Sequence, residues 1–370
     1  MSLKEIFCQD KAVSILQRAF TQGRMSHAYI FSGPEGVGRC KTAREWAKLL
    51  ICEHPILQKD YADSCGSCNC CRVFEAGSHP DYVEVYKELV EFTKEPKGRK
   101  RPVAFPVDVV REFLIEKVQH RPILAKRRVF VLKEAEKLNI ASQNALLKVL
   151  EEPPSYCSII LLCTRFEKLL ATVKSRCQVV RFGRIDEERT VEKLIGQGIE
   201  GDVALYFARF CQGRLGQACQ LCALELADAE IYNTKKKVVS FISTGELSQV
   251  LDMANWLLAE AKKISSIWSK RQEDVSVSDI NRKVVKLFVN VVISALRDAV
   301  CLQLGDNSTI TNFDQKADVE QLAKRFDPEA AAQKITNCYN TLHWIDSAVN
   351  EKLIFEQLLL NPFVCDTIDV

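Results

Sequence analysis

The stretch that decides the fold runs from Ala28 to Thr42 and reads Ala-Tyr-Ile-Phe-Ser-Gly-Pro-Glu-Gly-Val-Gly-Arg-Cys-Lys-Thr. An apolar run typical of a buried strand leads into a glycine-rich turn, and Thr42 to Ile51 reads as a helix. This order is the frame of a phosphate-binding loop, in which backbone N–H groups and the helix N-terminus hold an anion. We therefore expect an α/β domain built around this frame.

The loop departs from the consensus G-x-x-x-x-G-K-[ST] at two positions. Gly33 and Gly38 match, and Gly36 lies between them. Arg39 stands at the lysine position and Cys40 at the hydroxyl position. Arginine is a planar fork rather than a compact point charge, and a thiol is a poor ligand for Mg²⁺. We expect a degenerate Walker A loop formed by Gly33, Gly36, Gly38 and Arg39. Whether it still binds ATP or ADP is left open, and efficient hydrolysis is not expected.

Composition places the chain among ordinary soluble globular proteins. It has 370 residues, 47% hydrophobic and 27% charged, which is enough for two or three domains. A net charge of +3 does not by itself indicate nucleic-acid binding. No apolar run reaches the ~20 residues of a membrane span, and the N-terminal residues do not resemble a signal peptide. The sixteen cysteines therefore predict a cytoplasmic protein that uses thiols for metal or packing.

A group of cysteines follows the first predicted helix with the spacing C-x12-C-x2-C-x2-C: Cys52, Cys65, Cys68 and Cys71. Four thiolates in one short insert suit a tetrahedral zinc ion, whose role would be structural because a closed site has no open position for water. Cys70 does not fit the same geometry, and His54 follows Cys52 too closely to replace it. The alternative is a cysteine-rich loop without metal.

Strands and helices alternate along the first half of the chain, which predicts a three-layer α/β domain. The further strands are expected at Asp81–Val85, Arg128–Leu132, Ser158–Cys163 and Gln178–Phe182, and the further helices at Lys11–Gln22, Val107–Val118 and Ile140–Glu151. The basic run Lys97–Arg101 is typical of a solvated loop. The more specific alternative is that it contacts DNA or a partner protein.

The rest of the chain reads as helical. Three helices form a small unit, expected at Glu187–Gln197, Asp202–Cys211 and Leu215–Leu226. Apolar positions then recur at helical spacing without a chemical motif, which favours an assembly surface. The predicted domains are 1–183, with a zinc module at about 52–71, then 184–227, and a helical domain at 228–370.

Several motifs occur in a fixed order: Ser26–Tyr29, the loop Gly33–Arg39, the cysteine insert, Gly77–Asp81, Ala141–Pro154 and Ser175–Cys177. The series resembles the bacterial clamp-loader ATPases of the AAA+ class, and most closely the delta-prime branch of DNA polymerase III subunits. The resemblance covers roughly Met1 to Phe182. It implies an AAA+ domain, a three-helix lid and a helical collar, and it carries the zinc ligands onto the same four cysteines.

The resemblance also identifies residues that ATP hydrolysis would need. Lys133 replaces the metal-binding aspartate of the acidic motif, although Glu134 is retained. Thr164 stands at the first sensor position. The lid arginine aligns with Gly216, and Arg214 lies two positions early. With the loop lysine and hydroxyl also replaced, turnover of ATP in cis is not expected.

Arg176 of Ser175-Arg176-Cys177 matches the arginine that, in this family, is presented to ATP in the adjacent subunit. A guanidinium supplied in trans can stabilise charge on the transferred phosphoryl group. The alternative for Arg176, judged by spacing alone, is an ion pair with a carboxylate near the end of its strand.

By resemblance, the chain is expected to be a non-hydrolysing, delta-prime-like component of the DNA polymerase III holoenzyme. It would join gamma/tau and delta subunits in a ring that loads the sliding clamp on primed DNA. Two other functions compete with this one. The first is an active clamp-loader ATPase of the gamma/tau type, and the second is a zinc-dependent DNA-binding module that uses the cysteine insert and the basic run.

Overall fold

A computed structural model describes residues 2–94, 105–272, 275–306, 310–346 and 349–363. The chain divides into two compact units, Met1–Ile185 and Asp186–Val370, which are described separately below. The basic run Lys97–Arg101 lies outside the described residues. Within them, every helix is too short or too polar to cross a membrane.

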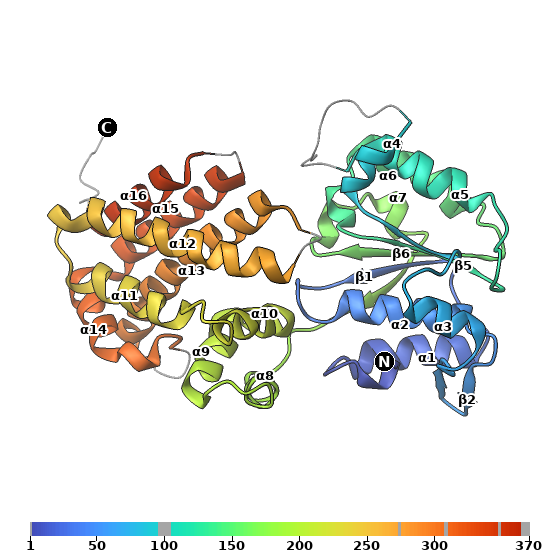
Figure 1. Ribbon diagram of the computed structural model, residues 1–370, viewed down its shortest axis with the longest axis horizontal. Helices are drawn as coiled ribbons and strands as arrows, with labels where there is room; N and C mark the ends of the chain where they lie inside the picture. The colour runs from blue at the N-terminus through green and yellow to red at the C-terminus, as the bar shows by residue number, and fades with distance from the viewer. Residues whose placement is uncertain (1, 95–104, 273–274, 307–309, 347–348, 364–370) are drawn as a thin grey trace. The chain divides into compact units, whose positions relative to one another are not determined.

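A five-stranded parallel sheet forms the centre of the first unit (Figure 1). The strand order is β4 (Tyr82–Val85), β5 (Arg128–Leu132), β6 (Cys157–Cys163), β1 (Ala28–Ser32) and β7 (Gln178–Arg181). Both β5 and β6 are buried along their whole length, as expected for apolar runs in a sheet covered on both faces. The α/β class predicted from the alternating pattern is confirmed.

Helices cover both faces of this sheet (Figure 1). One core contains residues of α1 (Asp10–Thr21) and α2 (Arg39–Ile51) packed on β1. The opposite core contains residues of α6 (Ile140–Glu151) and of the segment before it. The remaining helices are α3 (Asn69–Glu75), α4 (Val107–Val110), α5 (Glu116–Val118) and α7 (Ala171–Lys174), with a π-helical turn at Arg111–Ile115 between α4 and α5.

The start predicted for the helix after the loop was wrong. The sequence pattern placed it at Thr42, whereas α2 begins at Arg39. Gly38 adopts φ +103°, a left-handed conformation that suits glycine at a helix boundary, and Thr42 N–H already donates to its carbonyl at 2.9 Å. Arg39 therefore belongs to the first turn of the helix.

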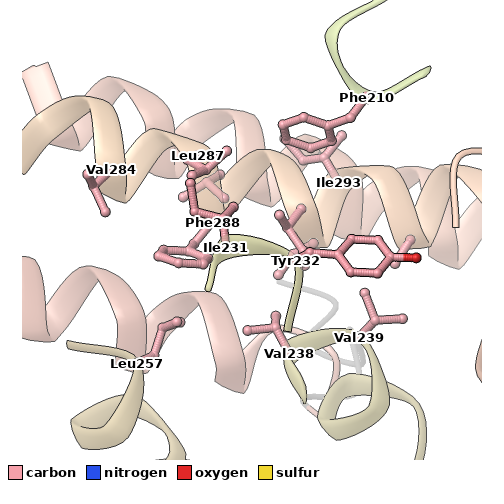
Figure 2. Close-up of a cluster of buried hydrophobic side chains, with 14 of the residues drawn as sticks. Phe210, Ile231, Tyr232, Val238, Val239, Leu257, Val284, Leu287, Phe288 and Ile293 are labelled. Carbon is pink, nitrogen blue, oxygen red and sulfur yellow. The ribbon is translucent and has the colours of Figure 1, made fainter. Parts of the chain in front are cut away.

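The second unit is helical throughout its described residues. Its helices are α8 (Glu187–Ile195), α9 (Gly201–Cys211), α10 (Leu215–Glu225), α11 (Ile231–Thr244), α12 (Val250–Arg271), α13 (Val277–Gln303), α14 (Lys316–Arg325), α15 (Pro328–Asp346) and α16 (Glu351–Leu360). One hydrophobic core extends from Leu194 in α8 to Leu359 in α16, and Figure 2 shows its central side chains, including Phe210, Tyr232 and Phe288. The division of this unit at residue 227 stays a prediction.

Asp81, which precedes β4, holds the loop before β5. Its buried carboxylate accepts the N–H groups of Ile123, Leu124 and Ala125 at 2.8, 2.7 and 2.9 Å. Burial acts to raise the pKa of Asp81, but the three hydrogen bonds outweigh it and the pKa is lowered. The charged form is therefore the one that the fold stabilises.

Asp81→Ala is expected to lower the free energy of unfolding of the full chain by about 3 kcal/mol, because it leaves three donors without their acceptor. Urea unfolding measures this loss. The control is Asp60→Ala, at the exposed turn of the antiparallel hairpin formed by β2 (Ile56–Gln58) and β3 (Tyr61–Asp63). Because the folded pKa is lowered, the contribution is complete above about pH 4 and is lost as the pH falls through the folded value. An unfolding free energy equal to that of the control at pH 7 would contradict this role.

Candidate functional site

The loop between β1 and α2 is held close to two other strands of the sheet. Gly33 N–H donates to the carbonyl oxygen of Cys163, the last residue of β6, at 3.2 Å. A Cβ on Gly33 would lie 2.5 Å from the carbonyl oxygen of Phe182, the residue after β7. Only glycine lets the loop approach this backbone so closely. Gly36 and Gly38 both have positive φ, so the loop has the strand–turn–helix frame that the sequence predicted.

Arg39 is bound to its own loop. The residue is 9% exposed, and its Nε donates to the carbonyl oxygen of Pro34 at 3.2 Å. Burial lowers the pKa of Arg39, while the carboxylate of Glu136 favours its charged form. The guanidinium thus binds the backbone of its own loop, whereas the lysine of a phosphate-binding loop extends towards the phosphate.

Lys133, directly after β5, forms an ion pair with Glu84 of the neighbouring strand β4. Burial disfavours the ammonium, but the bond to Glu84 outweighs it and raises the pKa of Lys133. A persistent positive charge at this position repels Mg²⁺, and the carboxylate of Glu84 is already paired. Glu84 was not among the residues predicted from the sequence, although a single acidic residue in the apolar strand Tyr-Val-Glu-Val is a signal that could have identified it.

Glu134 is also engaged. It adopts φ +54° and pairs with Lys137, and its second oxygen lies 3.6 Å from Lys87 Nζ. Thr164 bonds to Glu136, through its hydroxyl and through its N–H at 3.1 Å. Glu134 and Thr164 therefore both have partners from their own unit.

In the second unit, Arg214 precedes α10 and its Nε donates to the carbonyl oxygen of Cys211 at 2.9 Å. Gly216, which aligns with the lid arginine, is the second residue of α10. One donor of the Arg214 side chain is thus hydrogen-bonded to the last residue of α9.

Arg176 follows α7 and precedes β7, and 36% of its side chain is exposed. Its Nη2 lies 2.8 Å from Glu151 Oε1 at the end of α6. Its Nη1 donates to the carbonyl oxygen of Thr172 at 3.0 Å and to Ser175 Oγ at 3.4 Å. Arg176 therefore has a carboxylate partner, as the alternative from the sequence expected, but this partner lies at the end of helix α6 and not at the end of a strand. No role was predicted for Glu151 from the sequence.

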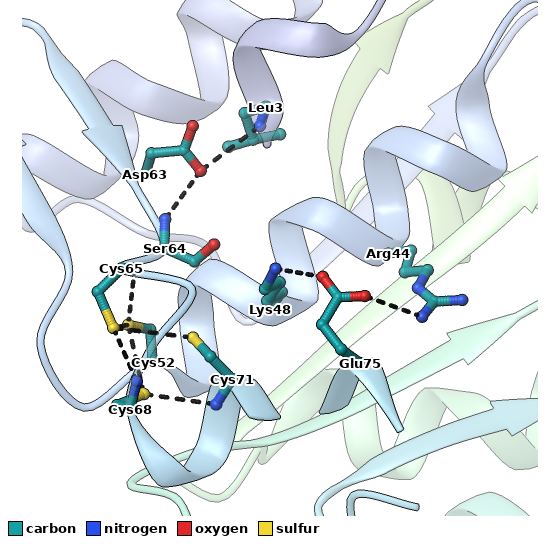
Figure 3. Close-up of polar contacts among 10 residues, drawn as sticks. All are labelled: Leu3, Arg44, Lys48, Cys52, Asp63, Ser64, Cys65, Cys68, Cys71 and Glu75. Carbon is teal, nitrogen blue, oxygen red and sulfur yellow. Dashed lines mark hydrogen bonds and ion pairs between the residues drawn. The ribbon is translucent and has the colours of Figure 1, made fainter. Parts of the chain in front are cut away.

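The structure brings the four predicted cysteines together (Figure 3). Their sulfur atoms all lie within 4.8 Å of one another. The sulfur–sulfur separations are 3.5 Å for Cys52–Cys65, 4.0 Å for Cys52–Cys68 and 4.0 Å for Cys65–Cys71. Zinc–sulfur bonds of about 2.3 Å in a tetrahedron place sulfur atoms about 3.8 Å apart. The donor set and its spacing therefore fit a structural zinc ion.

Backbone donors surround the same sulfur atoms. The N–H groups of Cys65, Cys68 and Cys71 point to Cys52, Cys65 and Cys68 sulfur at 3.4, 3.3 and 3.4 Å. Burial acts to raise the pKa of Cys65, but the N–H groups of Ser67 and Cys68 outweigh it and lower the pKa to about 6. Burial raises the pKa of Cys52 and of Cys71, so the N–H donors favour the thiolate, which is the form that binds metal, at Cys65 but not at those two residues.

Two neighbouring groups lie outside the four-sulfur cluster. Cys70 donates to Glu53 Oε1 at 3.2 Å, and burial with this bond raises its pKa to about 12. Lys48 of α2 pairs with Glu75 of α3, which also lies 3.6 Å from Arg44 (Figure 3). The Lys48–Glu75 pair ties α2 to α3 beside the cysteines.

Comparison with known proteins points to one group. A family model described as DNA polymerase III, delta subunit, matches residues 8–186, and one described as its C-terminal part matches residues 277–362. The DNA polymerase III subunit delta' of Pseudomonas aeruginosa is 37% identical over 155 residues, covering 41% of this chain and 42% of that protein. Subunit tau/gamma of Haemophilus influenzae is 30% identical over 237 residues, covering 62% of this chain and 32% of that protein.

The chain thus spans less than half the length of these two relatives. Among solved structures, a DNA polymerase III gamma subunit-related protein of Thermotoga maritima aligns with 96% of this chain and 98% of its own, at 15% identity and a TM-score of 0.45. A score this low adds nothing to the assignment. On the two family models and the relatives, the chain belongs to the DNA polymerase III clamp-loader subunit family.

Proposed function

We propose that this protein is a delta-prime-type, stator-like subunit of the clamp loader that does not hydrolyse ATP itself. The observation that carries the proposal is the state of the phosphate loop. Arg39 is hydrogen-bonded to Pro34 in its own loop, and Lys133 is paired with Glu84 where the family has a metal-binding aspartate. Hydrolysis of a phosphoanhydride needs charge stabilisation by a positioned metal ion and lysine, and the residues at both positions differ here.

In the assembled complex, the chain would stand beside gamma/tau and delta subunits. Arg176 would face ATP bound to a neighbour and act as an arginine finger in trans. Residues 1–183 would form the AAA+ domain, residues 184–227 the lid, and residues 228–370 the collar that holds the ring. The ring would use the neighbours' ATP to load the sliding clamp on primed DNA in the cytoplasm.

Zinc is the cofactor that this proposal includes. Cys52, Cys65, Cys68 and Cys71 would hold it, and the four thiolates would leave no position for a reacting water. Its contribution would be to fold the insert around the C-terminal end of α2. Any binding of ATP or ADP at Gly33, Gly36, Gly38 and Arg39 would be without turnover.

The purified chain is expected to show no ATP turnover above the buffer rate with Mg²⁺, because the metal and lysine positions are replaced. Steady-state phosphate release measures this rate for the unaltered chain, for Arg39→Ala and for Lys41→Ala, an exposed neighbour on α2 that serves as the control. Turnover by the unaltered chain that Arg39→Ala abolishes and Lys41→Ala preserves would overturn the proposal.

That outcome would support a gamma/tau-type ATPase, the second candidate. The observation in its favour is the length of the match, since the tau/gamma relative aligns over 237 residues and the delta' relative over 155. In that case Arg39 would have to leave Pro34 when nucleotide binds. A fluorescent ATP analogue titrated into the chain would then report saturable, Mg²⁺-dependent binding.

A further inference from the structure

The guanidinium of Arg176 is restrained on one side and open on the other. Glu151, at the last position of α6, pairs with Nη2 at 2.8 Å. The carbonyl oxygen of Thr172, one turn back along the chain, and Oγ of the preceding residue Ser175 accept from Nη1 at 3.0 and 3.4 Å. Among the residues that the structure describes, Arg176 Nε has no acceptor. One donor edge of the fork is therefore available to a group outside this chain.

We propose that Glu151 is a positioning residue that holds Arg176 ready for the nucleotide of the adjacent subunit. This inference rests on the proposed function, since it needs Arg176 to act in trans. Glu151 and the Thr172 carbonyl bind the two terminal nitrogens of the fork, which leaves Nε and the second proton of Nη2 for phosphoryl oxygens. The ligand class is the triphosphate of a bound nucleotide, and a bidentate contact with arginine suits its oxygens.

The carboxylate stands on a firmly placed element. Gln143 of α6 donates from Nε2 to the carbonyl oxygens of Leu138 and Lys168 at 3.0 and 3.2 Å, and its Oε1 accepts the N–H of Leu170 at 2.7 Å. This buried amide joins α6 to the segment that leads into α7 and Arg176. Glu151 and Arg176 therefore belong to two segments that are already fixed to each other, so their pairing orients the guanidinium.

The pairing suits orientation better than stability. Both side chains are partly exposed, 49% for Glu151 and 36% for Arg176, and ion pairs of this kind add little to folding. A long arginine side chain, however, loses considerable rotational freedom when it binds a phosphate. If Glu151 already holds the arginine in place, this entropy is lost when the chain folds and not when the reaction occurs. Correct placement matters because a catalytic group displaced by about 1 Å can lower the rate about a hundredfold.

The experiment reconstitutes the ring with gamma/tau and delta subunits and measures single-turnover ATP hydrolysis by quench flow. Four versions of this chain are compared with the unaltered one: Glu151→Gln, the control Glu152→Gln, Arg176→Ala, and the double variant of Arg176→Ala with Glu151→Gln. Glu152 is an exposed carboxylate one residue away. The thermal midpoint of each free chain is measured in parallel.

We expect Glu151→Gln to lower the rate at the site facing this subunit about tenfold, with an unchanged KM for ATP and an unchanged thermal midpoint. Glu152→Gln should match the unaltered chain. In the Arg176→Ala background, Glu151→Gln should have no further effect, because a positioning residue has nothing left to position. A merely structural role would lower the thermal midpoint and would add to the Arg176→Ala effect.

The outcomes separate this inference from the proposed function. If Arg176→Ala lowers the rate and Glu151→Gln does not, the positioning role is wrong and the trans finger stands. If Glu151→Gln raises the rate, the carboxylate competes with phosphate instead of orienting the fork, which also overturns the inference. If Arg176→Ala has no effect on the rate, the finger fails and the positioning role fails with it.

Discussion

Replacing Cys65 with alanine is expected to abolish binding of the proposed zinc ion and to lower the thermal midpoint of the chain by about 10 to 20 °C. The loss of one thiolate opens a four-sulfur site, and binding of structural zinc contributes on the order of 10 kcal/mol to folding in small zinc modules. A loss of about 5 kcal/mol from a unit of this size shifts the midpoint by the amount stated. Calorimetry gives the midpoint, and elemental analysis gives zinc per chain.

Cys70→Ala is the matched control, because Cys70 is equally close in sequence and buried but lies outside the four-sulfur cluster. It should keep one zinc per chain and shift the midpoint by only a few degrees. A purified unaltered chain without zinc, or equal midpoints for the two variants, would contradict the metal assignment.

The structure explains why the effect should spread beyond the insert. Cys52 follows the last residue of α2, and Cys65 follows the hairpin of β2 (Ile56–Gln58) and β3 (Tyr61–Asp63). Asp63 in turn accepts the N–H groups of Leu3 and Ser64, at 3.4 and 2.8 Å (Figure 3). Loss of the metal should therefore loosen the end of α2 and the N-terminal segment together, which hydrogen exchange can follow.

Arg176→Ala is expected to lower ATP hydrolysis in the reconstituted ring by about 10³-fold at the one site that faces this subunit. An arginine supplied in trans contributes on the order of 10³–10⁵ in rate by stabilising charge on the transferred phosphoryl group. Sites that receive an arginine from other subunits should keep their rates. A single-turnover time course should therefore lose one phase and retain the others.

Arg189→Ala is the control for this change, since Arg189 is an exposed arginine that pairs with Glu192 in its own helix at 3.7 Å. Gel filtration of both rings should show complete assembly, so that lost activity is not lost subunits. An Arg176→Ala ring with all phases intact would remove the trans finger from the proposal.

Local pattern was enough to predict much of the fold and of the candidate site. The strand Arg128–Leu132 and the helix Ile140–Glu151 were predicted with the bounds that the structure has. The apolar run that marks the strand and the prolines that end the helix are both signals carried by neighbouring residues. The four cysteines were found for the same reason. Three of them lie within seven residues, and their spacing in the sequence is the one that a tetrahedral zinc site requires.

The sequence by itself therefore determined the features that are encoded over short stretches: the parallel α/β class, the helical second half, the altered loop and the cluster of four cysteines. The tertiary structure alone decided the partners of the charged residues. The pairs Lys133–Glu84 and Arg176–Glu151 join residues 49 and 25 positions apart, because parallel strands and packed helices bring distant segments together. An ion pair depends on separation in space, and no periodicity along the chain records it.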